Sequence, residues 1–393
     1  MAKNEKGKSY KEISLFENST EASEMEKKPR DKSIPAGNKN TDASASVFGW
    51  RFQIVAAIIF SLMEIEKLKY VEIEGSTEDI ELYFNGLNTE YIQAKAIQKN
   101  PLDAKDNKKA KDAMNTLINT SNITKGRYSK LVYVANFRNP LNLKESLLNA
   151  SWMPAMNEAF IRPYTSLPRE GRDFIDKKIK SAQKDLGVKY LNTLDYFDLN
   201  RLYISTILLN PDDQDNEQLS VLSGTIEKFL ADADISTAIS RSKIDGIKGM
   251  LVDKYLSNAG SKEDGERHKK ITKEILIWRI IFELLEKAPG GSEDIPFDIE
   301  SEVEIYEQSF IQNQSENGEI ANKILGCLSM YTSGKSINRN GVNSFINEKW
   351  SNFKEIFPLD DDEMVQEYGI KSIMQRIIYG RRTINKIKGW AKV

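Results

Sequence analysis

The sequence contains almost none of the two side chains that most often bind zinc or act as general bases. Of its 393 residues, only Cys327 is a cysteine and only His268 is a histidine. Zinc sites with several His and Cys ligands, nucleases that combine a His base with a His ligand, and paired-His phosphodiesterases are therefore excluded. A Ser/His/Asp triad would need His268, which lies in a polar run and is better interpreted as a solvated surface residue. Hydrolysis by this chain would have to use carboxylates, lysine and a divalent metal.

The sequence also lacks an excess of either charge, a disulfide pair and a long apolar run. Acidic and basic residues number 58 and 56, so any contact with nucleic acid has to come from a local patch. A single cysteine cannot form an intramolecular disulfide, and the first residues lack the apolar segment of a secretory signal, so we expect a cytoplasmic protein. The most apolar stretch, residues 54–63, is shorter than the roughly 20 residues of a membrane span. It predicts a buried helix and no membrane association.

Composition divides the chain into a tail and two larger parts. Residues 1–46 are rich in Lys, Glu, Ser and Asn with few large apolar residues, which predicts a disordered tail. Residues 47–150 show helix and strand patterns in turn, whereas residues 151–393 show mainly helical periodicity. We therefore expect an α/β N-terminal domain, with a mixed sheet flanked by helices, followed by a mainly α-helical domain for assembly or partner docking.

The N-terminal domain is expected to begin with a buried helix and to continue as strands. Apolar residues surround the helix from Val47 on all sides. Strands are predicted at residues 69–74, 79–84, 91–96 and 130–136, with the turn pair Asn85-Gly86 after the second and a helix at 104–119. Beyond residue 151, helical spacing is found at 193–209, 218–232, 235–256, 270–287, 302–312 and 319–331.

A candidate catalytic set lies on the second and third of these strands. Gln93 and Lys95 are two residues apart, so their side chains project from the same face. Pairing of the adjacent strands can bring Asp79 beside them. A carboxylate that holds a divalent cation and a lysine that positions water are what phosphodiester hydrolysis without histidine requires. The sequence therefore predicts one metal-and-water site.

Three further residues are weaker candidates for the same site. Glu74, at the end of the first strand, is interpreted either as a second metal-binding carboxylate or as a solvated strand-end residue. Glu81 shares a face with Asp79 by alternation. Gln53 would face the site if its helix packs on the sheet, and is otherwise a helix-surface amide.

In order and strand context, four segments across about residues 47–148 resemble one family of nucleases. The segments are Gly49-x-x-Phe-Gln53, Ile73-Glu-Gly-x-x-Glu-Asp79-Ile-Glu-Leu, Tyr91-Ile-Gln93-Ala-Lys95 and Val132-Tyr-Val-Ala-Asn136. They are similar to the restriction-endonuclease-like, PD-(D/E)XK endonuclease domain of bacterial antiphage effectors. That domain occurs in CD-NTase-associated nucleases and in nucleases that partner HerA-type hexameric ATPases.

The resemblance implies an active site of Asp79, Gln93 and Lys95 that uses Mg²⁺ or Mn²⁺ to cleave DNA. The metal would be bound by Asp79, by the carbonyl oxygen of Gln93 and by Glu74 if that residue contributes. Gln93 is a neutral ligand where the wider superfamily has an acid, which weakens metal binding unless Glu74 takes part. The resemblance also implies a role in antiphage defence in the bacterial cytoplasm, with a HerA-type ATPase as first candidate partner, and we expect a homo-oligomer. Two alternatives stay open: a non-catalytic assembly or regulatory protein that retains the nuclease fold, and a nuclease directed at RNA.

The last part of the chain is basic and amphipathic, with no acidic residue after Glu367. Five of its basic residues are candidates for external contacts: Arg376, Arg381, Arg382, Lys386 and Lys388. One interpretation is contact with a DNA backbone or with an acidic partner surface. The preferred interpretation is a terminal helix with its apolar face docked and its charged face solvated.

Overall fold

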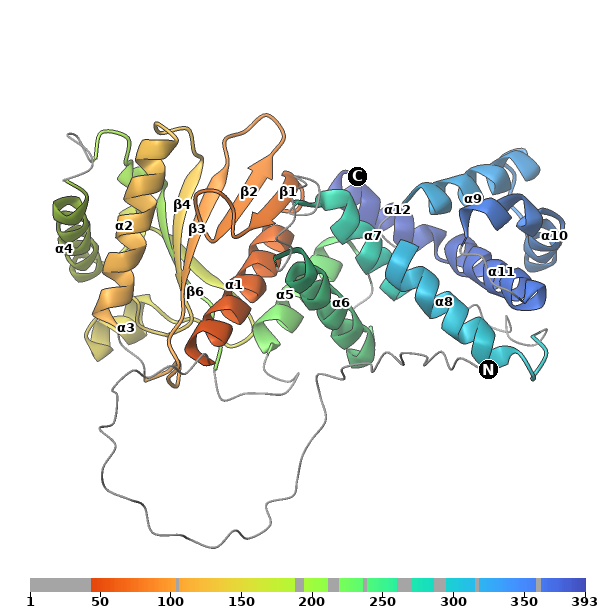
Figure 1. The fold of residues 1–393 in the computed structure, drawn as a ribbon, viewed down its shortest axis with the longest axis horizontal. Coiled ribbons are helices and arrows are strands. Elements are labelled where there is room, and N and C mark those ends of the chain that lie inside the picture. The colour runs from red at the N-terminus through yellow and green to blue at the C-terminus, as the bar shows by residue number, and fades with distance from the viewer. Residues whose placement is uncertain are drawn as a thin grey trace, which may run out of the picture. The chain divides into compact units, whose positions relative to one another are not determined.

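The fold is known over most of the chain beyond its N-terminal tail. The computed structural model describes residues 44–103, 106–187, 194–210, 219–235, 239–259, 270–285, 295–314, 318–357 and 362–393 (Figure 1). The tail expected at residues 1–46 lies almost wholly outside these ranges, and so does His268. Both remain predictions.

The N-terminal elements are those expected from the sequence. Helix α1 (Ser44–Met63) is followed by β1 (Leu68–Ile73), β2 (Ile80–Phe84), β3 (Glu90–Lys95), α2 (Asn107–Ile123) and β4 (Lys130–Ala135). β2 and β3 pair antiparallel, and Gly86 in the turn between them has a φ of +71°, which confirms the predicted hairpin. Asp106 caps the N-terminus of α2, because its side chain accepts hydrogen bonds from two backbone amides of the first turn.

Three strands from later in the chain complete a seven-stranded mixed sheet. They are β5 (Phe160–Pro163), β6 (Leu202–Thr206) and β7 (Lys270–Thr272), and the strand order is β5-β6-β4-β3-β2-β1-β7. β3, β4 and β6 are parallel, and the other neighbours are antiparallel. The expected fold class is confirmed, but the sheet extends to Thr272, well past the boundary expected at residue 150.

Two of the helix predictions are wrong where they fall on β6 and β7. Residues 202–206, inside the helix expected at 193–209, form a strand that pairs parallel with β4. A strand buried on both faces carries a continuous apolar run, which periodicity cannot distinguish from part of a buried helix. Residues 270–272 pair with β1 before α7 (Lys273–Leu284) begins, so the helix expected at 270–287 is shorter.

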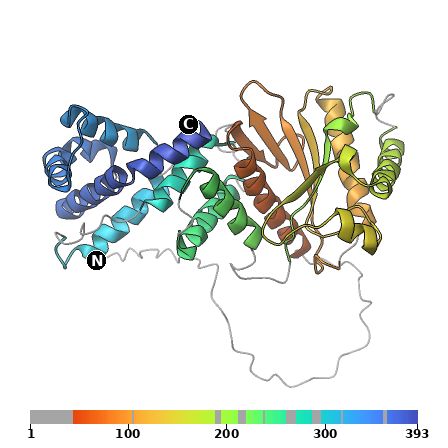
Figure 2. The same cartoon turned by 180° about the vertical axis from the view of Figure 1, so that it is seen from behind.

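Helices cover both faces of the sheet (Figures 1 and 2). One apolar core joins α1 to α5 (Ser220–Asp232) and α6 (Arg241–Ala259), and it includes the side chains that β1, β2 and β3 direct toward α1. The other core joins α2 and α4 (Arg169–Leu186) to the opposite face of the sheet. The sheet is therefore the middle of three layers.

Helix α1 occupies the centre of the first core. Its window Ser46–Met63 has a mean hydropathy of 1.6 and is long and apolar enough to cross a membrane, so the expectation of a shorter apolar stretch is wrong. The same window is 61% buried inside the protein, and Ile54, Ile58 and Ile59 are almost completely enclosed. A helix that is apolar on all sides and enclosed in this way is typical of a protein core.

The described chain after Thr272 is mainly helical. It contains α8 (Glu300–Gln314), α9 (Gly318–Tyr331), α10 (Arg339–Lys349), α11 (Glu363–Tyr379) and α12 (Arg381–Ala391), with a shorter helical segment at Trp350–Ile356. Lys273 ties this region to the sheet, because its ammonium donates to the carbonyls of Glu66 (3.0 Å) and Ala391 (2.8 Å). Before Thr272, shorter helical segments lie at Glu145–Ser151 (α3), Tyr164–Ser166 and Leu199–Arg201.

The same substitution at two leucines tests the core. Leu82 on β2 is 0% exposed, whereas Leu87 in the turn before β3 is 60% exposed. Leu82→Ala should lower the free energy of unfolding by about 2–5 kcal/mol, because it removes buried methyl groups and leaves a cavity. Leu87→Ala should change it by about 0.5 kcal/mol or less. Denaturant unfolding followed by tryptophan fluorescence measures both, and equal losses would contradict this placement of β2.

Candidate active site

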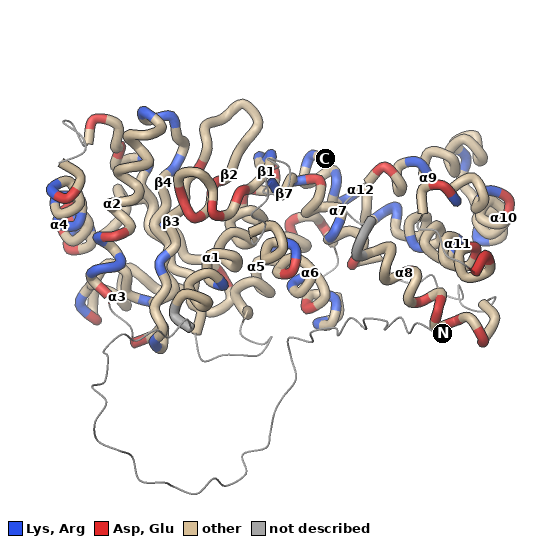
Figure 3. Tube along the Cα trace, viewed as in Figure 1, with Lys and Arg blue, Asp and Glu red and all other residues tan. Residues whose placement is uncertain are grey.

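The connection from β1 to β2, residues 74–79, places two acids at the same end of the sheet. Glu74 N donates a hydrogen bond to Asp79 O at 2.8 Å and closes the connection. Glu74 has a φ of +50°, in the left-handed region, which costs a non-glycine residue about 1 kcal/mol or more. In Figure 3 the acidic positions gather beside β2 and β3. The fold thus holds Glu74 in a strained conformation near Asp79.

The side chain of Glu81 supports this connection. Its Oε1 accepts hydrogen bonds from Thr77 N (2.8 Å) and Glu78 N (3.2 Å), and its Oε2 accepts one from Tyr83 Oη (2.5 Å). A Cβ on Gly75 would lie only 2.5 Å from Glu81 Oε1, so this close approach requires glycine. Glu81 is 0% exposed. Although alternation placed it near Asp79, the structure uses it to hold the shape of residues 74–79.

Asp79 is bound directly to β3. Its Oδ2 accepts a hydrogen bond from Ala94 N (2.9 Å) and another from Gln93 Nε2. Burial raises the pKa of the Asp79 carboxyl, and the Lys95 ammonium is the strongest influence that lowers it again. The structure therefore brings Asp79 next to Gln93 on β3, and the Lys95 charge acts on the same carboxylate. The sequence placed Asp79 on the second strand, but β2 begins one residue later, at Ile80.

The amide of Gln53 lies between the two acids. Hydrogen bonds from Gln53 lower the pKa of both Asp79 and Glu74, so its helix does pack with this side chain toward the site. Partial desolvation of its carboxyl and the nearby Asp79 carboxylate raise the pKa of Glu74, while Lys95 also lowers it. Glu74 itself is exposed at the surface. Helix α1, the β1–β2 connection and β3 thus supply five polar side chains to a single cluster: Gln53, Glu74, Asp79, Gln93 and Lys95.

The cluster suits a hard cation that takes few ligands from the protein. Within the described ranges, no group of three or more His, Cys, Asp or Glu residues could hold a metal ion. The cluster offers two carboxylates as metal ligands, those of Asp79 and Glu74. Mg²⁺ commonly uses one or two carboxylates and takes its other ligands from water and substrate phosphate. Gln93 presents its nitrogen to Asp79, so metal binding by its carbonyl oxygen would require rotation of the amide.

Glu78 is a buried acid beside the cluster that the sequence interpretation left without a role. Thr120 on α2 donates a hydrogen bond to its Oε1 (2.5 Å), whereas its Oε2 is buried without a hydrogen-bond partner. Burial raises the pKa of Glu78 to about 8. The carboxyl is therefore mostly protonated at neutral pH. Its position next to Asp79 was the available signal, but burial cannot be read from sequence spacing.

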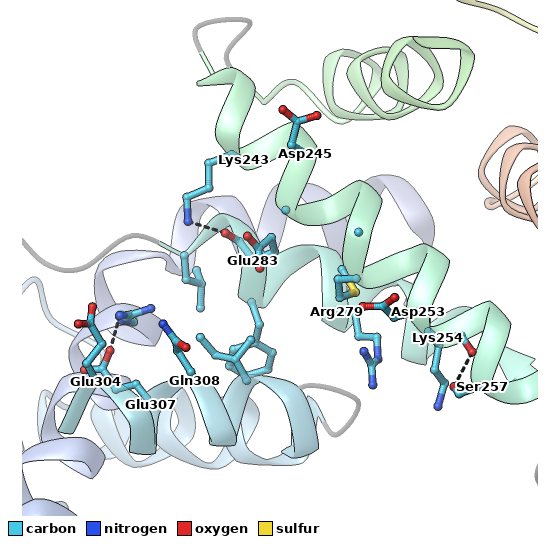
Figure 4. Close-up of a pocket in the computed structure, with 17 residues that line it drawn as sticks. Lys243, Asp245, Asp253, Lys254, Ser257, Arg279, Glu283, Glu304, Glu307 and Gln308 are labelled. Carbon is cyan, nitrogen blue, oxygen red and sulfur yellow. Dashed lines mark hydrogen bonds and ion pairs between the residues drawn. The ribbon is translucent and has the colours of Figure 1, made fainter. Parts of the chain in front are cut away.

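The candidate contact residue Arg376 points inward. It forms an ion pair with the buried Glu307 and lines a cavity of about 680 Å³ between α6, α7, α8 and α11 (Figure 4). In the same cavity, Lys243 Nζ donates to the carbonyl of Glu283 at 2.7 Å. Burial raises the pKa of the Glu283 carboxyl, and the Lys243 and Arg376 charges lower it. Arg376 therefore serves the internal polar network of the helical region.

The remaining C-terminal candidates lie on α12. Lys386 forms an ion pair with Asp234 (2.6 Å), and Lys388 donates to Asn322 Oδ1 (3.2 Å). Arg381 and Arg382 are exposed. The apolar side of the helix is buried through Ile384 and Ile387, as the docked terminal helix requires. This leaves Arg381 and Arg382 as the more accessible of the five.

Comparison of the chain with protein-family models, with curated proteins and with solved structures gives no match.

The pH dependence of stability should reveal the state of Glu78. Its folded-state pKa of about 8 lies above the usual 4.5, so folding favours the protonated acid. This stabilisation is complete below pH 4.5 and is lost as the pH rises through 8. Glu78→Gln copies the protonated acid at every pH. The melting temperature of the variant relative to wild type should therefore be higher at pH 9 than at pH 5.

The measurement uses thermal unfolding in EDTA, so that no metal ion contributes. Glu227→Gln on the exposed side of α5 is the control, and its difference from wild type should not follow the same trend. A Glu78→Gln difference that stays constant from pH 5 to pH 9 would show that Glu78 is ionised in the folded protein.

Proposed function

We propose that this chain is a metal-dependent endonuclease of the PD-(D/E)XK type that cleaves DNA. The observation that carries the proposal is the convergence of Asp79, Gln93 and Lys95 on adjacent strands, with Gln53 and Glu74 beside them. Asp79 accepts a hydrogen bond from Gln93, and the Lys95 charge lowers the pKa of Asp79, which supports the set of three that sequence spacing predicts. A carboxylate pair that holds a divalent metal ion next to a lysine can support hydrolysis without histidine.

Each side chain has a distinct part in the proposed reaction. Asp79 and Glu74 would hold Mg²⁺ or Mn²⁺, which supplies Lewis acidity and lowers the pKa of bound water. Lys95 orients or deprotonates the attacking water and offsets the negative charge that develops on the phosphorus centre. Gln93 and the Ala94 amide fix the Asp79 carboxylate, and Gln53 keeps Glu74 close to it.

The biological setting is proposed from the motif resemblance. It comprises antiphage defence in the bacterial cytoplasm, with a homo-oligomer or a HerA-type ATPase controlling the nuclease. The helical region from Lys273 onward offers the surface for such control, since its described residues lack the α/β alternation of an oligonucleotide-sensing domain. Arg381 and Arg382 are its candidate contacts with DNA or a partner.

A non-catalytic assembly or regulatory protein with a nuclease-like fold is the second candidate. One observation favours it: within the described residues, the site has two carboxylates and a glutamine instead of three acids. Such a set binds Mg²⁺ weakly in the absence of substrate phosphate. Both candidates predict the same fold, and they differ in the role of Lys95.

Lys95→Ala decides between these candidates. If the chain is a nuclease, the substitution should slow cleavage of plasmid DNA in Mg²⁺ by about a hundredfold or more, because it removes the cation that acts on the transition state. Lys228→Ala on the exposed face of α5 is the matched control and should cleave like wild type. Cleavage is measured on purified full-length protein with Mg²⁺, with Mn²⁺ and with EDTA.

The outcomes separate the proposals. EDTA should abolish cleavage, and thermal unfolding should show that both lysine variants remain folded. Parallel digestion of DNA and RNA identifies the substrate polymer, and faster cleavage of RNA would replace DNA in the proposal. No cleavage by the wild type would leave the assembly protein as the better interpretation, and equal cleavage by Lys95→Ala and wild type would remove Lys95 from the proposed active site.

A further inference from the structure

Asn136 closes the end of β4 and is completely enclosed, with 0% exposure. Its Oδ1 accepts a hydrogen bond from Ile97 N (2.9 Å), and its Nδ2 donates to Ile97 O (3.0 Å) and to Leu209 O (3.1 Å). All three bonds are made to backbone groups. The side chain thus replaces a strand partner for Ile97 after regular pairing of β3 and β4 has ended.

The residue that Asn136 holds lies two positions after Lys95. Lys95 pairs with Ala135 at the last step of the β3–β4 ladder, and Asn136 N donates to Lys95 O at 3.4 Å. Leu209 follows β6, whose partner strand is also β4. Asn136 therefore ties together the exits of three parallel strands at the end of the sheet where Lys95 stands.

We infer that Asn136 is a positioning residue for the proposed cleavage reaction, which acts by fixing the backbone that carries Lys95. The inference rests on the proposed function. A primary amide is the natural group here, because it offers an acceptor and two donors at once. Without it, the backbone N–H and carbonyl of Ile97 lose the hydrogen bonds that the Asn136 side chain makes to them, and the end of β3 is free to shift. A displacement of about 1 Å in a catalytic group can slow a reaction by about a hundredfold.

The chain supplies a matched control three residues away. Asn139 is also buried, and its side chain accepts a hydrogen bond from Leu143 N (2.8 Å) and donates to Leu143 O (2.9 Å). It has the same amide and the same paired contact with one backbone residue. Its contacts close the connection at residues 139–143, so it does not bind the strand of Lys95.

Three variants separate positioning from general stability. Asn136→Ala and Asn136→Asp both remove the Nδ2 donors, and the Asp variant does so with little change in side-chain size. Asn139→Ala removes the comparable hydrogen bonds to Leu143. For both Asn136 variants we expect kcat on plasmid DNA to fall about ten- to hundredfold with KM within about twofold of wild type. Asn139→Ala should melt earlier but keep kcat within about twofold.

Hydrogen exchange of the peptide that covers residues 93–98 is the second measurement. It should speed up in both Asn136 variants and stay at the wild-type rate in Asn139→Ala.

If Asn136→Ala does not fold, the test is made with the isosteric Asp variant. Wild-type kcat in the folded Asn136 variants, or an equal loss in Asn139→Ala, would overturn the inference while leaving the nuclease proposal intact. An inactive wild type would count against the nuclease proposal alone, and exchange at residues 93–98 would then decide whether Asn136 holds this strand.

Discussion

The pair of hydrogen bonds that Asp79 Oδ2 accepts from β3 is the interaction on which the site depends. A partly buried carboxylate loses hydrogen bonds to water, and hydrogen bonds from protein donors must replace them. Ala94 N and Gln93 Nε2 provide those donors, so the connection from β1 can lie only where Asp79 meets β3. The consequence reaches Glu74, whose backbone is tied to Asp79 by its own hydrogen bond. One contact thus fixes the distance between the acids and the strand that carries Lys95.

The buried acids of the site lower the stability of the fold, and hydrogen bonds from the surrounding structure offset part of this loss. Within four residues, Glu78, Asp79 and Glu81 are all buried or partly buried, and each acid in such a position destabilises the fold unless it is protonated or bonded. Glu81 accepts hydrogen bonds from three donors, Asp79 accepts them from β3, and burial raises the pKa of Glu78, which favours its protonated form. A protein selected for stability alone would place apolar residues here. The concentration of acids at this point supports a functional origin.

The elements that could be predicted from the sequence are those whose signals come from residues close together in the chain. The alternation of β2 and β3, the Asn85-Gly86 turn and the spacing of Gln93 and Lys95 each involve neighbours in the chain, and the structure confirms the resulting hairpin. Prediction from the sequence failed for β6 and β7, because a short interior strand and a three-residue edge strand depend on partners far away in sequence. Glu78 was missed for the same reason: Thr120, its hydrogen-bond donor, lies 42 positions later.

These long-range contacts extend the sheet and the core around α1 well beyond residue 150. β7 pairs with β1, and β6 completes the parallel side of the sheet beside β4. The core around α1 also takes apolar side chains from α5, α6 and α7, which an isolated segment would leave out. Exposure of so apolar a helix would favour aggregation over folding.

β1, the strand that leads to Glu74, is directly connected to the helical region, because β1 pairs with β7 and the last residue of β7 directly precedes α7. A change in the packing of α7 has a direct covalent and hydrogen-bonded route to β1, through three residues of β7 and the contact of Lys273 with Glu66.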